Sequence, residues 1–150
     1  MERITSFTID HTTLMPGIYI SRIDGDIVTY DLRVCRPNHP PFMEVPAIHT
    51  IEHIFATLAR NSAMKDSIIY FGPMGCRTGF YLLVRDPDHA AVIDLIRECF
   101  SRISSWQDKK PGTTAAECGN YLEHDLTTAR KYAADYLTVI SQWDDTKLNY

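Results

Sequence analysis

The sequence predicts one α+β domain, in which an antiparallel sheet packs against helices. Its 150 residues suit a single domain, and 45% of them are hydrophobic, which is enough for a core and argues against disorder. Two pairs of strand-like segments lie close together in the sequence, and amphipathic helical patterns follow them. Strands this close in sequence pair antiparallel through short turns, and the helices then cover the sheet.

The first pair of strands is expected at Gly17–Ile23 and Asp26–Arg36, with Asp24-Gly25 as a tight turn between them. Side chains alternate between the faces of a strand, so one face of the second strand is apolar, at Val28, Tyr30, Leu32 and Val34. The opposite face carries Asp31, Arg33 and Cys35. These polar groups either line a site or face solvent, and the pattern alone slightly favours solvent.

A proline-rich loop over residues 37–46 separates this pair from the first helix, because proline fixes its own backbone angle and restricts the residue before it. Pro46 suits the first turn of a helix. Residues 46–60 then carry apolar side chains at the spacing of a buried stripe, at Ile48, Ile51, Phe55 and Leu58. The first helix is therefore predicted over residues 46–60.

The second pair of strands is expected at Ser67–Phe71 and Thr78–Arg85, joined through residues 72–76. Asp86-Pro87-Asp88 offers the start of a helix over residues 88–104. The apolar positions of that helix form one stripe: Val92, Leu95, Ile96, Cys99, Phe100 and Ile103.

Residues 107–120 are polar and include Pro111 and Gly112, which predicts a loop. A third helix is predicted over residues 125–142. Its packing side comprises Ala129, Tyr132, Ala133, Tyr136, Leu137 and Ile140.

Composition and charge argue against several classes of function. The net charge of −4 argues against a nucleic-acid partner, which requires a clustered positive surface. No apolar run of about 18 residues is present, so no membrane span is expected, and Met1–Ser6 lacks the apolar stretch of a signal peptide. The chain is therefore expected in the cytoplasm, where its four cysteines stay reduced. Cys35 and Cys99 are assigned no function.

The sharpest local signal is His49-Thr50-Ile51-Glu52-His53. Positions four apart lie one turn apart on the same face of a helix, so His49 and His53 can direct imidazole nitrogens at one metal ion. Glu52 can act beside the metal as a proton-transfer partner, in the order of the inverzincin pattern. The alternative, that both histidines are ordinary helix residues, is less favoured at this spacing.

A catalytic metal needs a third protein ligand and an open position. Glutamate would suggest a peptidase, with Glu98 and Glu117 available, whereas cysteine would suggest other chemistry. Cys118 lies in a loop beside Gly119, where the backbone can approach closely. Spacing alone does not connect Cys118 to the two histidines.

Cys76 lies on a glycine-flanked turn beside Arg77, a setting expected to make a thiol reactive. A turn cysteine without a role is an equally good interpretation of this pattern alone.

Five segments, in order along the chain, together resemble the S-ribosylhomocysteine lyase (LuxS) family. They are Asp10-His11-Thr12 with Ser6 before it, Asp31-Leu32-Arg33, the His49–His53 helix, Gly72–Tyr81 with its Pro-Met-Gly-Cys run, and Glu117-Cys118-Gly119. Each segment alone is weak evidence, but all five in this order are highly specific. The resemblance covers nearly the whole chain.

The resemblance implies a metal site and two acid/base groups. The metal ligands would be His49, His53 and Cys118, and the acid/base groups would be Glu52 and Cys76. The family metal is ferrous iron in the native state, with zinc or cobalt as substitutes. Two imidazoles and a thiolate are plausible ligands for these ions.

The resemblance also implies a partner and a set of substrate contacts. Ser6, His11 and Arg33 would contact the substrate. The family works as a homodimer with active sites at the subunit interface, so Ser6 and His11 would serve the metal of the neighbouring chain.

The reaction implied is cleavage of the thioether of S-ribosylhomocysteine to homocysteine and 4,5-dihydroxy-2,3-pentanedione, the precursor of autoinducer-2. Elimination of the sulfur requires a carbonyl beside the carbon that loses its proton, so the sugar carbonyl must first migrate from C1 to C3. A Lewis-acidic metal polarises each carbonyl, while Glu52 and Cys76 share the proton transfers. Arg33 would hold the homocysteine carboxylate through two parallel hydrogen bonds. The product would serve quorum sensing or recycling in the methyl cycle.

One position departs from the family pattern. The family carries an aspartate shortly before the Pro-Met-Gly-Cys run, in a stretch like Ile-Ile-Asp-Ile-Ser, where this chain has Ile68-Ile69-Tyr70-Phe71-Gly72. An acidic substrate contact is therefore lost at Tyr70 or supplied by another group. The metal ligands and the acid/base pair are unaffected by this difference.

Two other functions use the same residue types. A metallopeptidase of the inverzincin type would take a downstream glutamate as its third ligand and leave Cys76 unused. A metal-stabilised binding module, which is not an enzyme, would close its metal with four protein ligands. Replacement of Cys118 separates the peptidase from the lyase, because only the lyase would lose its metal.

Overall fold

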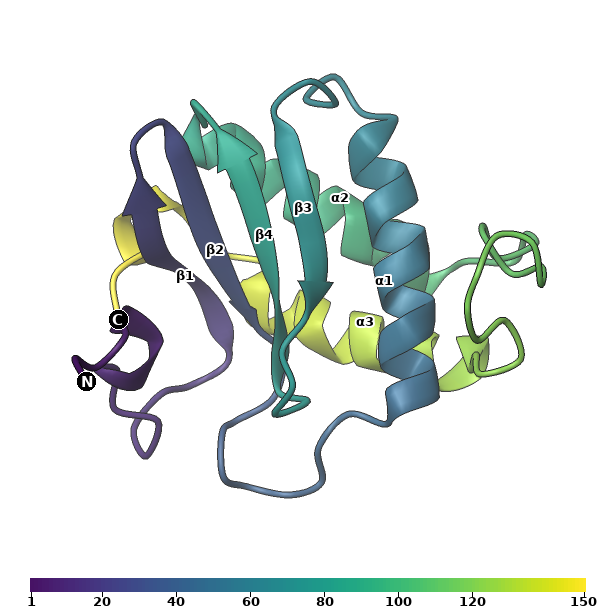
Figure 1. The fold of residues 1–150 in the computed structure, drawn as a ribbon, viewed down its shortest axis with the longest axis horizontal. Helices are drawn as coiled ribbons and strands as arrows, with labels where there is room; N and C mark the ends of the chain where they lie inside the picture. Colours follow the sequence, from purple (N-terminus) through teal and green to yellow (C-terminus); the bar gives the residue numbers. More distant parts are fainter.

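Four strands form a single antiparallel sheet in the order β1-β2-β4-β3, and three helices pack against it (Figure 1). The computed structural model describes all residues from Met1 to Tyr150. Its strands are β1 (Gly17–Asp24), β2 (Ile27–Arg33), β3 (Ile68–Pro73) and β4 (Gly79–Arg85), and its helices are α1 (Val45–Arg60), α2 (His89–Ser104) and α3 (Leu126–Ile140). The predicted fold class is confirmed. None of the helices has the length and apolarity needed to cross a membrane.

The turn of the first hairpin lies one residue later than predicted. Asp24 pairs with Ile27, so the two turn residues are Gly25-Asp26 rather than Asp24-Gly25. Gly25 adopts a φ of 61°, in the left-handed region that glycine enters without a steric penalty. A two-residue hairpin turn needs a positive φ at its first central residue, which explains why glycine occupies that position.

Strand β2 ends at Arg33, before the predicted end at Arg36. The backbone N–H groups of Val34 and Cys35 both donate to the carbonyl of Thr78, at 2.9 Å each, instead of continuing the ladder. This contact turns the chain out of the sheet and into the proline-rich loop. It also fixes the end of β2 beside the turn that carries Cys76.

The core lies between the helices and one face of the sheet. Every residue of the predicted stripes of α1 and α2 is buried, whereas Tyr132 and Leu137 of the predicted α3 stripe are only partly buried. Phe55 of α1 stacks on Phe71 of β3, with 3.9 Å between ring centroids, and Phe71 in turn lies 5.0 Å from Phe80 of β4. Burial of each such side chain contributes roughly 1.5–3 kcal/mol. This packing fixes which face of α1 points outward.

The predicted loop between α2 and α3 contains no helix or strand. It runs along the side of α1 that faces away from the sheet, where Figure 1 shows it in green. Residues 107–120 therefore lie beside the outward face of α1. Asp125 ends the loop as the N-cap of α3, where its side chain accepts a hydrogen bond from the Thr128 N–H at 2.9 Å.

Asp88 is the N-cap of α2, and its Oδ1 accepts a hydrogen bond from the Ala91 N–H at 3.1 Å. We expect Asp88→Ala to lower the free energy of unfolding by about 1 kcal/mol, because a donor of the first turn then loses its partner. The urea midpoint of purified protein measures this change. Asp135→Ala is the matched control, since Asp135 only pairs with exposed Lys131, and it should change stability by less than about 0.5 kcal/mol. Equal effects of the two substitutions would contradict the capping role.

Candidate metal centre

Helix α1 presents His49 and His53 on its outward face. Its opposite face is buried against the sheet, while both histidines are half-buried. Because they lie four residues apart, the rings stand one turn apart, with centroids at 4.5 Å and planes at 89°. The predicted placement of two imidazoles on one helix face is therefore present.

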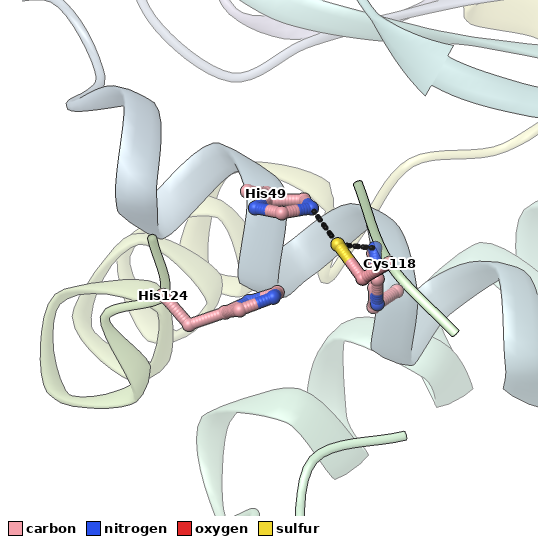
Figure 2. Close-up of side chains that lie close together, drawn as sticks. His49, Cys118 and His124 are labelled. Carbon is pink, nitrogen blue, oxygen red and sulfur yellow. Dashed lines mark hydrogen bonds between the residues drawn. The ribbon is translucent and has the colours of Figure 1, made fainter. Parts of the chain in front are cut away.

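Cys118 joins the two histidines from the loop between α2 and α3, as Figure 2 shows. Its Sγ lies 3.4 Å from His49 Nε2 and 3.9 Å from His53 Nε2. Glu117, the peptidase alternative at this point of the chain, instead accepts a hydrogen bond from the Thr114 hydroxyl at 2.7 Å. The donor that reaches the two imidazoles is thus a thiol, as the family resemblance implies.

Two backbone carbonyls of the same loop orient the rings. His49 Nδ1 lies 2.8 Å from the Glu123 carbonyl, and His53 Nδ1 lies 3.0 Å from the Pro111 carbonyl. A carbonyl only accepts, so each Nδ1 carries the hydrogen, and each Nε2 keeps its lone pair. Both lone pairs are then available on the side of Cys118. Metal-binding histidines commonly donate their other ring N–H to a backbone carbonyl in this way.

His124 is a fourth member of the cluster and was not predicted from the sequence. The donor atoms of His49, His53, Cys118 and His124 all lie within 4.8 Å of one another. The His124 ring stacks on that of His49, with 4.0 Å between centroids and 21° between planes. Burial, followed by the neighbouring histidines, lowers the pKa of His124 from 6.5 to about 4, which keeps the ring neutral.

The donor set fits a transition-metal ion. Two imidazole nitrogens and one thiolate suit iron, zinc or cobalt better than magnesium or calcium, which prefer oxygen. A ligand set of His49, His53 and Cys118 alone would leave a further position open, as in catalytic rather than structural sites. Glu52 lies between the two histidines on the same helix, half-buried, and takes part in none of the ion pairs of the chain. It is therefore free to act as a base.

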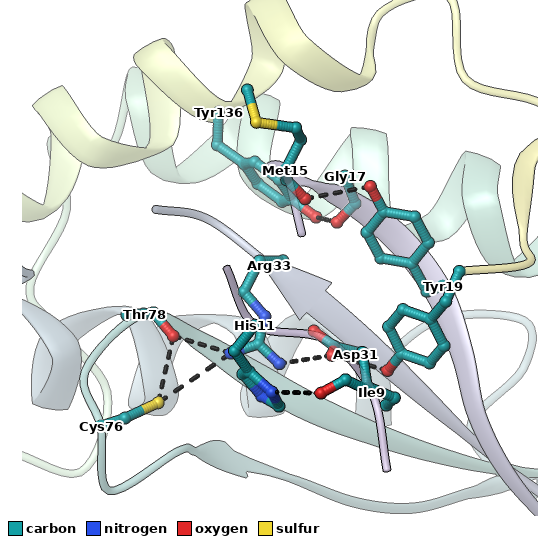
Figure 3. A network of polar contacts seen from close by, with 11 residues as sticks. Ile9, His11, Met15, Gly17, Tyr19, Asp31, Arg33, Cys76, Thr78 and Tyr136 are labelled. Atoms are coloured by element: carbon teal, nitrogen blue, oxygen red, sulfur yellow. Dashed lines mark hydrogen bonds and ion pairs between the residues drawn. The ribbon is translucent and has the colours of Figure 1, made fainter. Parts of the chain in front are cut away.

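A second polar group surrounds Cys76 at the turn between β3 and β4 (Figure 3). Cys76 Sγ lies 3.1 Å from Thr78 Oγ1 and 3.9 Å from Arg33 Nη1. Arg33 also donates to Thr78 Oγ1 at 2.7 Å and pairs with Asp31 Oδ2 at 2.5 Å. A thiolate at Cys76 would therefore face a guanidinium and a hydroxyl.

Of the two interpretations of Asp31 and Arg33, the solvent-facing one that the pattern slightly favoured is contradicted by the structure. Their exposed fractions are 0% and 2%, because residues distant in sequence cover this face of β2. Tyr150 donates to Asp31 Oδ2 at 2.7 Å and stacks on Tyr19 of β1, with 5.0 Å between centroids. Cys35, the third residue of that predicted face, lies beyond the end of the strand and is half-buried against the core.

The remaining predicted site residues fall in two places. His11 donates from Nδ1 to the Ile9 carbonyl at 2.9 Å and lines a small hollow together with Cys76 and Thr78. Ser6 lines a different hollow, beside Tyr81 on the outer face of the sheet. Within one chain, Ser6 and Cys76 line different hollows, and neither hollow includes a metal ligand.

Helix α1 separates the Cys76 group from the metal ligands. Figure 1 shows the loop that carries Cys118 on one side of α1 and the β3–β4 turn that carries Cys76 on the other. Tyr70, at the position where the family carries an aspartate, lies on β3 with 51% of its surface exposed. One chain thus holds two separate groups of chemically active side chains.

Comparison with known proteins identifies relatives along the full length of the chain. The sequence model of the S-ribosylhomocysteinase (LuxS) family matches residues 4–147. S-ribosylhomocysteine lyase of Borreliella burgdorferi (strain ZS7) is 47% identical over 156 aligned positions, covering 100% of this chain and 99% of the relative. The lyases of Finegoldia magna and Clostridium acetobutylicum are 46% and 42% identical, with the same coverage.

Cys118→Ser should remove most of the bound metal, because a serine hydroxyl is a poor replacement for a thiolate ligand. Metal content per chain, measured after dialysis, tests this expectation. Cys76→Ser is the matched control and should retain the metal, since Cys76 lies on the other side of α1. Retention of the metal by Cys118→Ser would instead favour a peptidase-like ligand set.

Proposed function

Because the chain belongs to the S-ribosylhomocysteinase (LuxS) family, we propose that it cleaves the thioether of S-ribosylhomocysteine, giving homocysteine and 4,5-dihydroxy-2,3-pentanedione. It is an enzyme of the carbon–sulfur lyase class. The observation that carries the proposal beyond the family match is the cluster of His49, His53 and Cys118, whose donor atoms lie within reach of one ion. Neither the peptidase nor the non-enzymatic alternative is favoured by the relatives or by this donor set.

The metal supplies Lewis-acid polarisation of the sugar carbonyl when it is bound. We take His49, His53 and Cys118 as its ligands and ferrous iron as the native ion. A thiolate with two imidazoles is a plausible set for iron and equally for zinc or cobalt, so the identity of the ion needs metal analysis of protein purified without air.

Glu52 and Cys76 are the proposed acid/base pair. Each migration of the carbonyl takes a proton from one carbon and returns it to the neighbouring carbon. A basic side chain must therefore contact the substrate near the metal. Glu52 is one residue from His53 and has no competing partner in the chain. Cys76 is exposed, and its sulfur faces Arg33 and Thr78, which would stabilise a thiolate.

Ser6, His11 and Arg33 are the proposed substrate contacts. His11 shares a hollow with Cys76, which supports a role beside that thiol. Arg33 is already paired with Asp31, but its Nε is buried without a partner and remains available as a donor. Tyr70 offers a phenol where the family has a carboxylate, so any acidic contact to the substrate must come from another residue.

A homodimer with shared active sites is the proposed assembly. The metal ligands and Cys76 lie on opposite sides of α1, so a substrate that needs both groups requires two copies of the chain. Exposed apolar side chains lie close in sequence to both groups: Phe7 and Met15 flank His11, and Tyr121 and Leu122 follow Cys118. Their burial against a second copy would favour association.

The proposed location is the cytoplasm. All four cysteines are free thiols, and Cys118 and Cys76 must remain reduced for the chemistry above. Reducing compartments preserve such thiols.

The function is tested by following free thiol from S-ribosylhomocysteine with anaerobically purified, metal-loaded protein. We expect Glu52→Gln to keep its metal and to lose about 10²–10⁴-fold in turnover, because an amide cannot carry the proton. Cys76→Ala should likewise retain metal and stop the reaction. Glu98→Gln, on the exposed face of α2, is the matched control and should behave like the unmodified protein. No thiol release from protein holding one metal per chain would refute the proposed reaction.

Shared sites are tested by mixing two inactive variants, Cys76→Ala and Cys118→Ser. Random pairing gives half heterodimers, each with one intact site of two, so activity should return to about a quarter of the unmodified level. Glu52→Gln mixed with Cys118→Ser is the control, since both residues belong to the same side of the site. That mixture should stay inactive. Absence of recovery in the first mixture would place each active site within one chain.

A further inference from the structure

His124 lies against the metal ligands but has no part in the proposed reaction so far. It lies in the loop immediately before the N-cap of α3, and its ring extends toward Cys118 from beside His49 (Figure 2). Its centroid is 4.9 Å from that of His53. The residue therefore adjoins the position that the three ligands leave open.

Thr50 assigns the hydrogen on the His124 ring. The Thr50 hydroxyl donates its single hydrogen to the Pro46 carbonyl at 3.0 Å and accepts from the Asp125 N–H at 3.0 Å. With the Thr50 hydrogen directed at Pro46, we assign His124 Nδ1, 3.1 Å from the same oxygen, as a donor. Nδ1 therefore carries the hydrogen, and Nε2 holds a lone pair, as in His49 and His53.

His124 Nε2 is buried and has no hydrogen-bond partner within the chain. Buried polar atoms of native proteins are nearly always satisfied, so an orphaned acceptor beside a metal site indicates a missing donor. Two other buried side-chain atoms lack partners, Asp31 Oδ1 and Arg33 Nε, and both belong to the Cys76 group. The orphaned atoms thus occur only where a substrate is proposed to bind.

Ring geometry argues against His124 as a fourth metal ligand. An imidazole binds a metal in its own plane, and the planes of His49 and His124 are nearly parallel, at 21° and 4.0 Å. An ion in the plane of His49 therefore lies off the plane of His124. The planes of His49 and His53, at 89°, instead intersect and can share one ion. The plane of His124 also crosses that of His53, at 72°, but an ion held in the planes of both His49 and His53 would lie off the plane of His124.

We propose that His124 Nε2 accepts a hydrogen bond from a hydroxyl of the substrate sugar that lies at the open position of the metal site. This inference rests on the proposed lyase function. A hydroxyl carbon that becomes a carbonyl carbon loses one hydrogen from carbon and one from oxygen, and the neighbouring carbonyl gains both. Glu52 and Cys76 serve the hydrogens on carbon, and His124 Nε2 accepts a hydrogen bond from the hydroxyl whose hydrogen passes to the neighbouring carbonyl oxygen.

The test measures substrate affinity in cobalt-loaded Glu52→Gln protein, which binds S-ribosylhomocysteine without turning it over. The visible spectrum of cobalt reports both metal coordination and the arrival of substrate. An added His124→Asn substitution keeps a donor toward Thr50 but removes the acceptor at Nε2. It should leave the metal content and the substrate-free spectrum unchanged and weaken substrate binding about tenfold. An added His124→Gln substitution keeps an acceptor near the Nε2 position and should recover most of the affinity.

Three results would overturn the inference. If His124→Asn binds substrate as tightly as the parent protein, the proposed contact does not exist. If His124→Asn loses metal to the same extent as Cys118→Ser, His124 is a metal ligand instead. The nitrogen NMR shifts of the His124 ring in zinc-loaded protein report its tautomer without any variant. A hydrogen on Nε2 rather than on Nδ1 would refute the proposed role of Nε2 as an acceptor. Failure of the proposed function looks different, because the cobalt-loaded parent would then show no response to S-ribosylhomocysteine.

Discussion

The metal centre depends on two hydrogen bonds that join helix α1 to the loop between α2 and α3. His49 and His53 donate from Nδ1 to the carbonyls of Glu123 and Pro111. These bonds set the tautomer and the rotation of each ring, and they also position a loop that has no regular secondary structure of its own. Cys118 meets the two Nε2 atoms because the loop is held at both ends in this way.

The division of α1 into two faces organises the rest of the molecule. One face is buried against β3 through Phe55 and Phe71, so the histidines have only the outward face available. The Cys76 group forms instead around a buried ion pair, Asp31–Arg33, on the face of β2 opposite to its core residues Tyr30 and Leu32. Thr78 and Tyr150 contribute hydrogen bonds to this pair from other elements of the chain, while Asp31 Oδ1 and Arg33 Nε have no partner. The two groups are therefore built independently, each by its own packing.

Periodicity and turn chemistry were sufficient to predict the elements, but contacts between distant segments were not accessible from the sequence. The stripes of α1 and α2 follow from local spacing, and the structure buries all of their residues. The burial of Asp31 was missed because Tyr150, distant in sequence, covers it. The alternation of side chains along a strand assigns each residue to one face of the sheet, but it does not predict which other segments cover that face. His124 was missed for a similar reason, since a single histidine before a helix has no periodic partner that would reveal its neighbours.

Because both carbonyls that orient the metal-binding histidines belong to the backbone, the outer shell of this centre is largely independent of side-chain identity in the loop. Substitutions at Glu123 preserve the carbonyl, and evolutionary drift in the loop can proceed without altering the electronic environment of the metal. Gly112 is the exception: its φ is 66°, and a Cβ there would lie 2.9 Å from His53 Nδ1. Selection on the loop should therefore act mainly on its length, on this glycine, on Cys118 and on His124, and the residues between Gly112 and Cys118 are freer to diversify.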